Sequence, residues 1–156
     1  MTDDPDSEQV RDWLDEELIA GVEHVPDPEA EFNLAVEMSN LVVHVVRRRQ
    51  GGPLVVGQQI EYGPGIRERI SGLAPADRNA LVGRIRETLT AAPVVYGFHD
   101  ERGANVAFGD VHRVLVERRI YADAVSQQSV MDALVEVWKV LRYLDDIESL
   151  LETVER

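Results

Sequence analysis

The order of hydrophobic patterns along this 156-residue chain predicts an α+β fold, a twisted antiparallel sheet of about five strands with helices packed on it. Apolar residues recur at helical spacing near both ends of the chain and once in the middle. Three strand-like segments follow the first helical pattern, and two more follow the second. Short turn sequences join neighbouring strands, as in antiparallel hairpins. The predicted order is α-β-β-β-α-β-β-α in one domain, residues 1–156.

The first helix is predicted to begin at Asp6 or Ser7, either of which can cap it, and to run to about Ala20. Gly21 can end it in the left-handed conformation that other residues avoid. Residues 1–5 precede it as an acidic tail that we expect to be disordered. The apolar side of the helix consists of Val10, Trp13, Leu14 and Leu18.

Residues 32–38, 41–46 and 54–62 are predicted to form three sequential antiparallel strands. The first alternates apolar and polar residues, which indicates a half-buried strand. The second is apolar on both faces except for His44, which is typical of a central strand. Ser39-Asn40 and residues 50–53 have the composition of tight turns.

The second helix is predicted to begin at Pro75, which suits a first helical turn, and to stop before Pro93. Residues 66–74, which precede it, fit neither pattern. Residues 94–99 and 105–121 then complete the sheet, the latter as one long bent strand or as two strands. The buried stripe of the second helix consists of Leu81, Val82, Ile85 and Leu89.

The last helix is predicted to begin at Ser126 or Ser129 and to extend over roughly 27 residues, or about 40 Å. A helix of this length is comparable to the width of the domain, so part of its apolar stripe would lack an intramolecular partner. Spacing near 3.5 residues suits pairing with another helix, and also packing across a sheet. We expect dimer or partner contacts at Leu134, Val137, Leu141, Leu144 and Leu151.

Charge and composition exclude several classes of protein. With 29 Asp and Glu against 16 Lys and Arg, the chain lacks the basic excess that nucleic-acid or anionic membrane partners require. Abundant carboxylates with Lys139 as the single lysine are typical of a halophilic cytoplasm. The absence of cysteine excludes disulfides and thiolate sites. We predict a cytoplasmic protein, because neither a signal peptide nor an apolar span is present.

Recognised catalytic and nucleotide-binding motifs are absent, so we predict no catalytic residue, cofactor or metal. The alternative is a small enzyme with a histidine and carboxylate site in a sheet-helix cleft, built from His44, His99 or His112. The arginine runs at residues 47–49 and 118–119 form an anion site only if their strand ends are adjacent. Such runs more commonly keep strand ends soluble.

Three structural junctions carry a family resemblance: Trp13-Leu14 in the first helix, Pro26-Asp27-Pro28 before residues 32–38, and Ile120-Tyr121-Ala122-Asp123 before the last helix. With the order of elements, they resemble an uncharacterised archaeal family with a type III secretion chaperone-like fold. The resemblance spans nearly the whole chain and implies a small acidic dimer that binds extended segments of other proteins. We therefore predict a noncatalytic, homodimeric protein-binding or chaperone-like module that recognises a protein or peptide.

Overall fold

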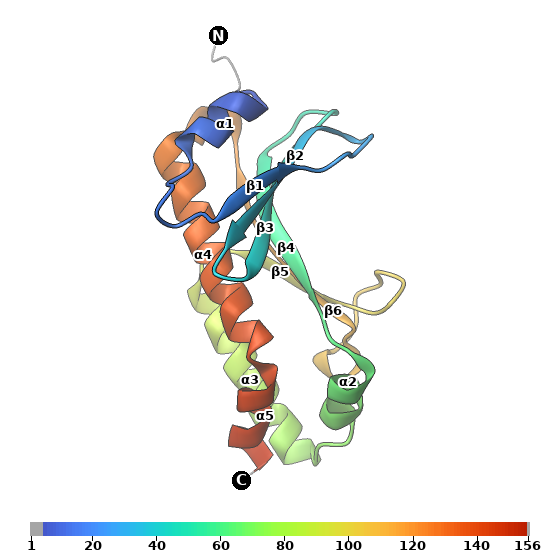
Figure 1. The fold of residues 1–156 in the computed structure, drawn as a ribbon. Coiled ribbons are helices and arrows are strands. Elements are labelled where there is room, and N and C mark those ends of the chain that lie inside the picture. The colour runs from blue at the N-terminus through green and yellow to red at the C-terminus, as the bar shows by residue number, and fades with distance from the viewer. Residues whose placement is uncertain (1–4, 156) are drawn as a thin grey trace. The chain divides into compact units, whose positions relative to one another are not determined.

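In the computed structural model, which describes residues 5–155, six strands form an open antiparallel sheet in the order β1-β2-β3-β4-β6-β5 (Figure 1). The predicted α+β class is confirmed, with one strand more than expected. Residues 1–4 of the predicted disordered tail lie outside the described residues, and Pro5 is buried. The elements are α1 (Ser7–Trp13), β1 (Gly21–His24), β2 (Ala30–Met38), β3 (Leu41–Arg48), β4 (Leu54–Glu61), α2 (Pro64–Ser71), α3 (Pro75–Ala91), β5 (Val95–His99), η1 (Phe108–Asp110), β6 (Arg113–Ile120), η2 (Ala122–Ala124), α4 (Gln127–Asp145) and α5 (Ile147–Glu155).

The chain divides into two structural units, each assembled from two separate stretches of sequence. The first comprises Met1–Gln58 and Glu117–Trp138, and the second Gln59–Val116 and Lys139–Arg156. The divisions fall inside β4, β6 and α4, so each of these elements contributes residues to both units. The single domain predicted for residues 1–156 remains a prediction.

In the first unit, β2 pairs antiparallel with both β1 and β3. Its side chains alternate between buried and more exposed positions, as its sequence predicts. The connection to β3 is a two-residue turn in which Ser39 and Asn40 have φ angles of 45° and 68°. Positive φ at both positions is the requirement of a type I′ turn, and asparagine tolerates it better than most residues. The predicted turn is confirmed.

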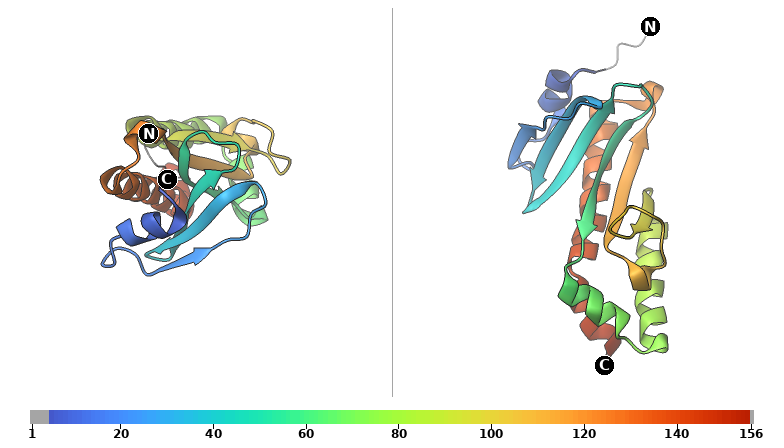
Figure 2. Two further views of the ribbon diagram at one scale, coloured as in Figure 1. Left: turned by 90° about the horizontal axis from the view of Figure 1, so that it is seen from above. Right: turned by 90° about the vertical axis from the view of Figure 1, so that its right-hand side faces the viewer.

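Helices cover one face of the sheet in the first unit. Figure 2 shows α1 and the first part of α4 on the same side of β2 and β3. The Trp138 indole N–H donates to the Met38 carbonyl at 2.9 Å, and the Gln127 side-chain amide donates to the Trp13 carbonyl at 3.0 Å. These bonds fix the two helices over the sheet, where the buried side chains are Val10 of α1 and Leu34, Val36, Val43 and Val45 of the strands.

In the second unit, α3 packs against α5. The buried residues recur at steps of four in α3 and at steps of four and three in α5, which places each stripe on one helix face. Tyr62 is buried in the same unit, and its hydroxyl donates to the Leu144 carbonyl of α4 at 3.0 Å. The ring of Phe108 contacts Tyr62 and Phe98 edge to face, at 6.4 and 5.2 Å between centroids.

The first helix is shorter than predicted, because the chain leaves helical geometry at Leu14. The Asp15 carboxylate accepts from the Glu17 N–H at 2.9 Å and so begins a turn, and consecutive acidic residues oppose the negative end of the helix dipole. Leu18, which we predicted on the buried side, is 49% exposed. Gly21 does not end a helix but begins β1.

Two further differences concern helices. Residues 66–74, which fit no pattern, contain most of α2, where Pro64 occupies the first turn. The predicted last helix is two helices, α4 and α5, separated at Asp146. Aspartate is a poor helix former, and Asp145 and Asp146 stand together at this break. Between residues 105 and 121 the regular strand is β6, with a separate bridge at Asn105.

Candidate functional site

The apolar stripe of the last helices forms core. The five side chains predicted to contact a partner have no exposed surface within the single chain. In this conformation they present no surface to a second protein, so a partner surface has to lie elsewhere on the chain. Self-association itself stays a prediction. The five residues are Leu134, Val137, Leu141, Leu144 and Leu151.

The histidines do not form the predicted histidine–carboxylate pairs. His44, in the first unit, hydrogen-bonds the Asn33 side-chain oxygen at 2.8 Å through Nδ1, and burial lowers the pKa of His44 below its ordinary value of 6.5. In the second unit, the backbone N–H of His112 donates to the backbone carbonyl of His99 at 2.8 Å. Within residues 5–155, no histidine hydrogen-bonds a carboxylate, and no group of three or more His, Asp or Glu residues is arranged to hold a metal ion.

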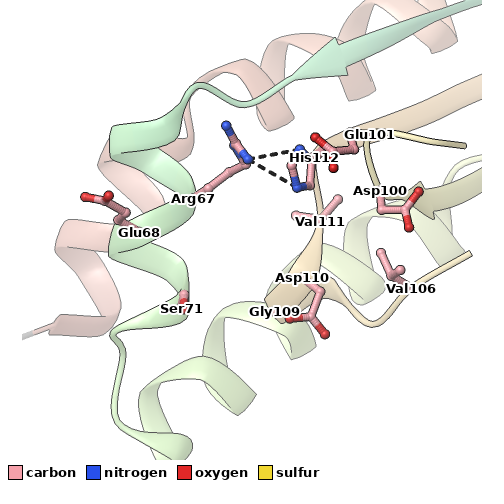
Figure 3. Close-up of a pocket in the computed structure, with 10 residues that line it drawn as sticks. All are labelled: Arg67, Glu68, Ser71, Asp100, Glu101, Val106, Gly109, Asp110, Val111 and His112. Carbon is pink, nitrogen blue, oxygen red and sulfur yellow. Dashed lines mark hydrogen bonds between the residues drawn. The ribbon is translucent and has the colours of Figure 1, made fainter. Parts of the chain in front are cut away.

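An open pocket of about 540 Å³ lies beside His112 in the second unit (Figure 3). Arg67 extends into it from α2, with Nη1 at 3.0 Å from Nδ1 and 3.1 Å from Nε2 of His112. If Nη1 lay in the plane of the imidazole ring at these two distances, it would overlap a ring carbon. The guanidinium therefore lies over the imidazole face, which is a cation–π arrangement. The Arg67 Nε–H also donates to the Tyr62 carbonyl at 3.1 Å, so this arginine is held in place.

The remaining charged groups of this pocket are acidic. The lining includes Glu68, Asp100, Glu101 and Asp110. Of these four described carboxylates, that of Asp100 is the one with hydrogen-bond partners. Asp100 accepts from the backbone N–H groups of Ala104 and Arg102, and these bonds, the first above all, lower the pKa of its carboxyl. Asp100 is thus held by backbone groups, and no hydrogen bond joins two side chains of this lining as a nucleophile and its base.

The two arginine runs do not create an anion site. Arg47 is 3% exposed and donates to the Gly52 carbonyl at 3.0 Å, so it stabilises the turn between β3 and β4. Arg119 forms an ion pair with Glu117 of the same strand at 2.8 Å. The predicted role in solubility therefore fits Arg48 and Arg49, which are exposed.

Strand β1, which the sequence analysis missed, has a free edge in the first unit. It lies at the end of the strand order and pairs only with β2 among the described strands. The Val25 N–H donates to the Asn33 carbonyl at 2.8 Å, which fixes the alternation along the strand. In an antiparallel ladder the backbone groups of successive residues point to opposite sides. Val22 and His24 therefore direct their N–H and C=O groups away from β2, into the open edge.

A second pocket, of about 310 Å³, adjoins this edge. It is formed by the end of α1, the connection that follows it and the first half of β1. Apolar and charged side chains are mixed in its wall, and two of the three charges are negative. The lining residues are Arg11, Asp12, Leu14, Glu16, Ile19, Gly21 and Val22. This site could not be predicted from the sequence, because four residues without alternation are too short a pattern for a strand.

Fold and site together define an α+β protein with an open antiparallel sheet whose edge strand β1 adjoins a pocket. The chain belongs to the family described as uncharacterized conserved protein (DUF2299), which matches residues 6–147. It is also similar to the crystal structure of an uncharacterized protein from Methanothermobacter thermautotrophicus.

That similarity has a TM-score of 0.72 at 19% sequence identity and covers 94% of this chain and 97% of the archaeal one. At this identity the likeness shows the fold. No curated protein matches the chain. The prediction of an uncharacterised family is confirmed, and the structural relative is archaeal. None of the helices in the described part of the chain is long and apolar enough to cross a bilayer.

Proposed function

We propose that this protein is a noncatalytic protein-binding module, which holds an extended segment of a partner by adding it as a strand to β1. The observation that carries the proposal is the free edge at Val22 and His24, which offers two N–H donors and two C=O acceptors. Main-chain hydrogen bonds of this kind supply affinity in strand addition, and adjoining pockets supply specificity. The resemblance to secretion chaperones supports the same activity in a cytoplasmic homodimer.

The test replaces His24 with proline. His24→Pro removes one outward N–H and leaves the bonds between β1 and β2, because proline is tolerated where its nitrogen faces outward from an edge strand. His24→Ala is the matched control, since it removes the same side chain and keeps the N–H. Each purified variant serves as bait in lysate of the source organism. We expect wild type and His24→Ala to capture a partner protein that His24→Pro does not capture. Equal capture by all three would contradict strand addition.

Self-association is measured separately, by light scattering coupled to size-exclusion chromatography. A mass near twice the 17.5 kDa of the chain would support the homodimer. A stable monomer would contradict the homodimer and leave strand addition in place, because β1 has its free edge within one chain.

A second candidate is a small enzyme that uses the pocket of Arg67 and His112. The pocket volume and the fixed guanidinium favour it, because a held cation can orient an anionic substrate group. Ligand-observed NMR with carboxylic acids, phosphates and amines tests it. Binding that Arg67→Gln abolishes would support this candidate, and absence of binding by every compound would contradict it.

A further inference from the structure

The negative charge of this protein is concentrated in its first 38 residues. They contain thirteen Asp and Glu and one Arg, whereas the other 118 residues contain sixteen Asp and Glu and fifteen Lys and Arg. Almost the whole formal net charge of −13 therefore belongs to the segment that forms α1, β1 and β2. The remainder of the chain is close to neutral.

Several of these carboxylates lie on β1 or beside it. Asp12 and Glu16 line the adjoining pocket, Glu23 is exposed on the strand, and Glu37 is the strand partner of Gly21. Among the described residues, none of the four forms an ion pair with a cationic side chain. No close ion pair among the described residues therefore neutralises them, and a cation at the edge would reduce their mutual repulsion.

The same charges oppose pairing of β1 with another copy of itself. In an antiparallel pair that joins Val22 of each copy to His24 of the other, the two Glu23 side chains stand directly opposite. Like charges in this position destabilise a strand pair. Charged residues on edge strands are a common means of preventing self-pairing, and the sign of the charge decides which strands are rejected. An acidic edge rejects acidic strands and accepts basic ones.

We propose that the edge of β1 receives an extended basic segment of a partner protein, with one lysine or arginine side chain in the adjoining pocket. This inference rests on the proposed function. Leu14, Ile19 and Val22 supply an apolar wall for the aliphatic stem, and Asp12 and Glu16 supply carboxylates for the charged head. Arg11 is the one cation among the lining side chains, so the pocket remains negative. A volume of about 310 Å³ accommodates one long side chain.

Two fluorescent synthetic peptides test the charge. Each has about nine residues, the length of a long strand, and alternates valine with lysine in one peptide and with glutamate in the other. Anisotropy titrations at about 50 mM salt should show the lysine peptide binding at least about tenfold more tightly, and about 500 mM salt should weaken it severalfold. Equal affinity of the two peptides would overturn the basic segment and leave strand addition standing.

Backbone methylation of the lysine peptide tests strand addition independently of charge. One derivative carries N-methyl groups on its lysines and the other on its valines, so each blocks one edge of the extended peptide. We expect only one derivative to lose affinity, by about fivefold or more, because only one edge donates to β1. Equal affinities of both derivatives and the parent, or equal loss in both, would overturn the proposed function as well.

Matched protein variants locate the site. The triple variant Asp12→Asn, Glu16→Gln and Glu23→Gln removes three carboxylates beside β1, and we expect it to weaken the lysine peptide about tenfold or more. The control Glu87→Gln, Glu148→Gln and Glu152→Gln removes the same charge from exposed positions on α3 and α5. An equal loss in the control would show a response to net charge alone and overturn the site.

Discussion

Truncation of Leu141 distinguishes a core side chain from a partner contact. Leu141 has no exposed surface within the chain, so Leu141→Ala removes side-chain atoms that are packed on every side. Such substitutions lower the free energy of unfolding by about 3–5 kcal/mol, through lost burial and the cavity that remains. The expected loss is a large fraction of the total stability of a domain, which is about 5–15 kcal/mol.

Urea unfolding followed by circular dichroism measures this loss, at two protein concentrations about tenfold apart. Leu18→Ala is the control, because the same atoms are removed from a leucine that is 49% exposed, and we expect it to cost less than about 1 kcal/mol. A loss below about 1 kcal/mol for Leu141→Ala would refute the core assignment. So would a loss that varies with protein concentration and accompanies a lower mass in solution, since that is the behaviour of a dimer contact.

Two further predictions concern buried polar side chains. Tyr62→Phe removes the hydrogen bond to the Leu144 carbonyl and should cost about 1 kcal/mol at pH 7. Burial raises the pKa of Tyr62 well above its ordinary 10.0, so above about pH 10 the tyrosine ionises in the unfolded chain before it does in the folded one. The stability of the wild type should therefore fall more steeply above pH 10 than that of Tyr62→Phe. Parallel stability curves in urea unfolding up to pH 11 would contradict this. The pKa of His44 is lowered by burial, so the unfolded chain takes up the proton first and stability should decrease as the pH falls below about 6.5. His44→Gln should flatten this decrease in urea unfolding between pH 5 and 8, and an unchanged slope would count against it.

Much of the fold could be predicted because its elements carry strong local patterns. The alternation in β2, the Ser39-Asn40 turn and the apolar stripe of α3 each depend on residues close in sequence. The end of α1 depends instead on a side-chain turn at Asp15, which competes with a helical pattern that the sequence continues to Leu18. The four residues of β1 form a strand because β2 lies beside them, and that is tertiary context.

The candidate site was harder to predict, since it depends on which surfaces the fold covers. Spacing identified the stripe of Leu134 and Leu141 correctly as apolar, but it could not show that the chain itself buries that stripe. The free edge consists of backbone groups at Val22 and His24, and backbone groups carry no sequence signal. The contact of Arg67 with His112 joins residues 45 positions apart, which no short motif could indicate.

The position of the carboxylates bears on what the acidic composition means. Adaptation of a protein to a saline cytoplasm acts through the hydration and repulsion of its whole surface, and therefore calls for acidic residues throughout the chain. Residues 39–156 do not show such an excess, with sixteen acidic and fifteen basic residues. Of the formal net charge of −13, −12 belongs to residues 1–38, the part of the chain that contains the edge strand β1. The proposed basic partner accounts for this uneven distribution, whereas adaptation to salt accounts for the overall acidity, and titration of the lysine peptide against wild type and the two triple variants separates these explanations.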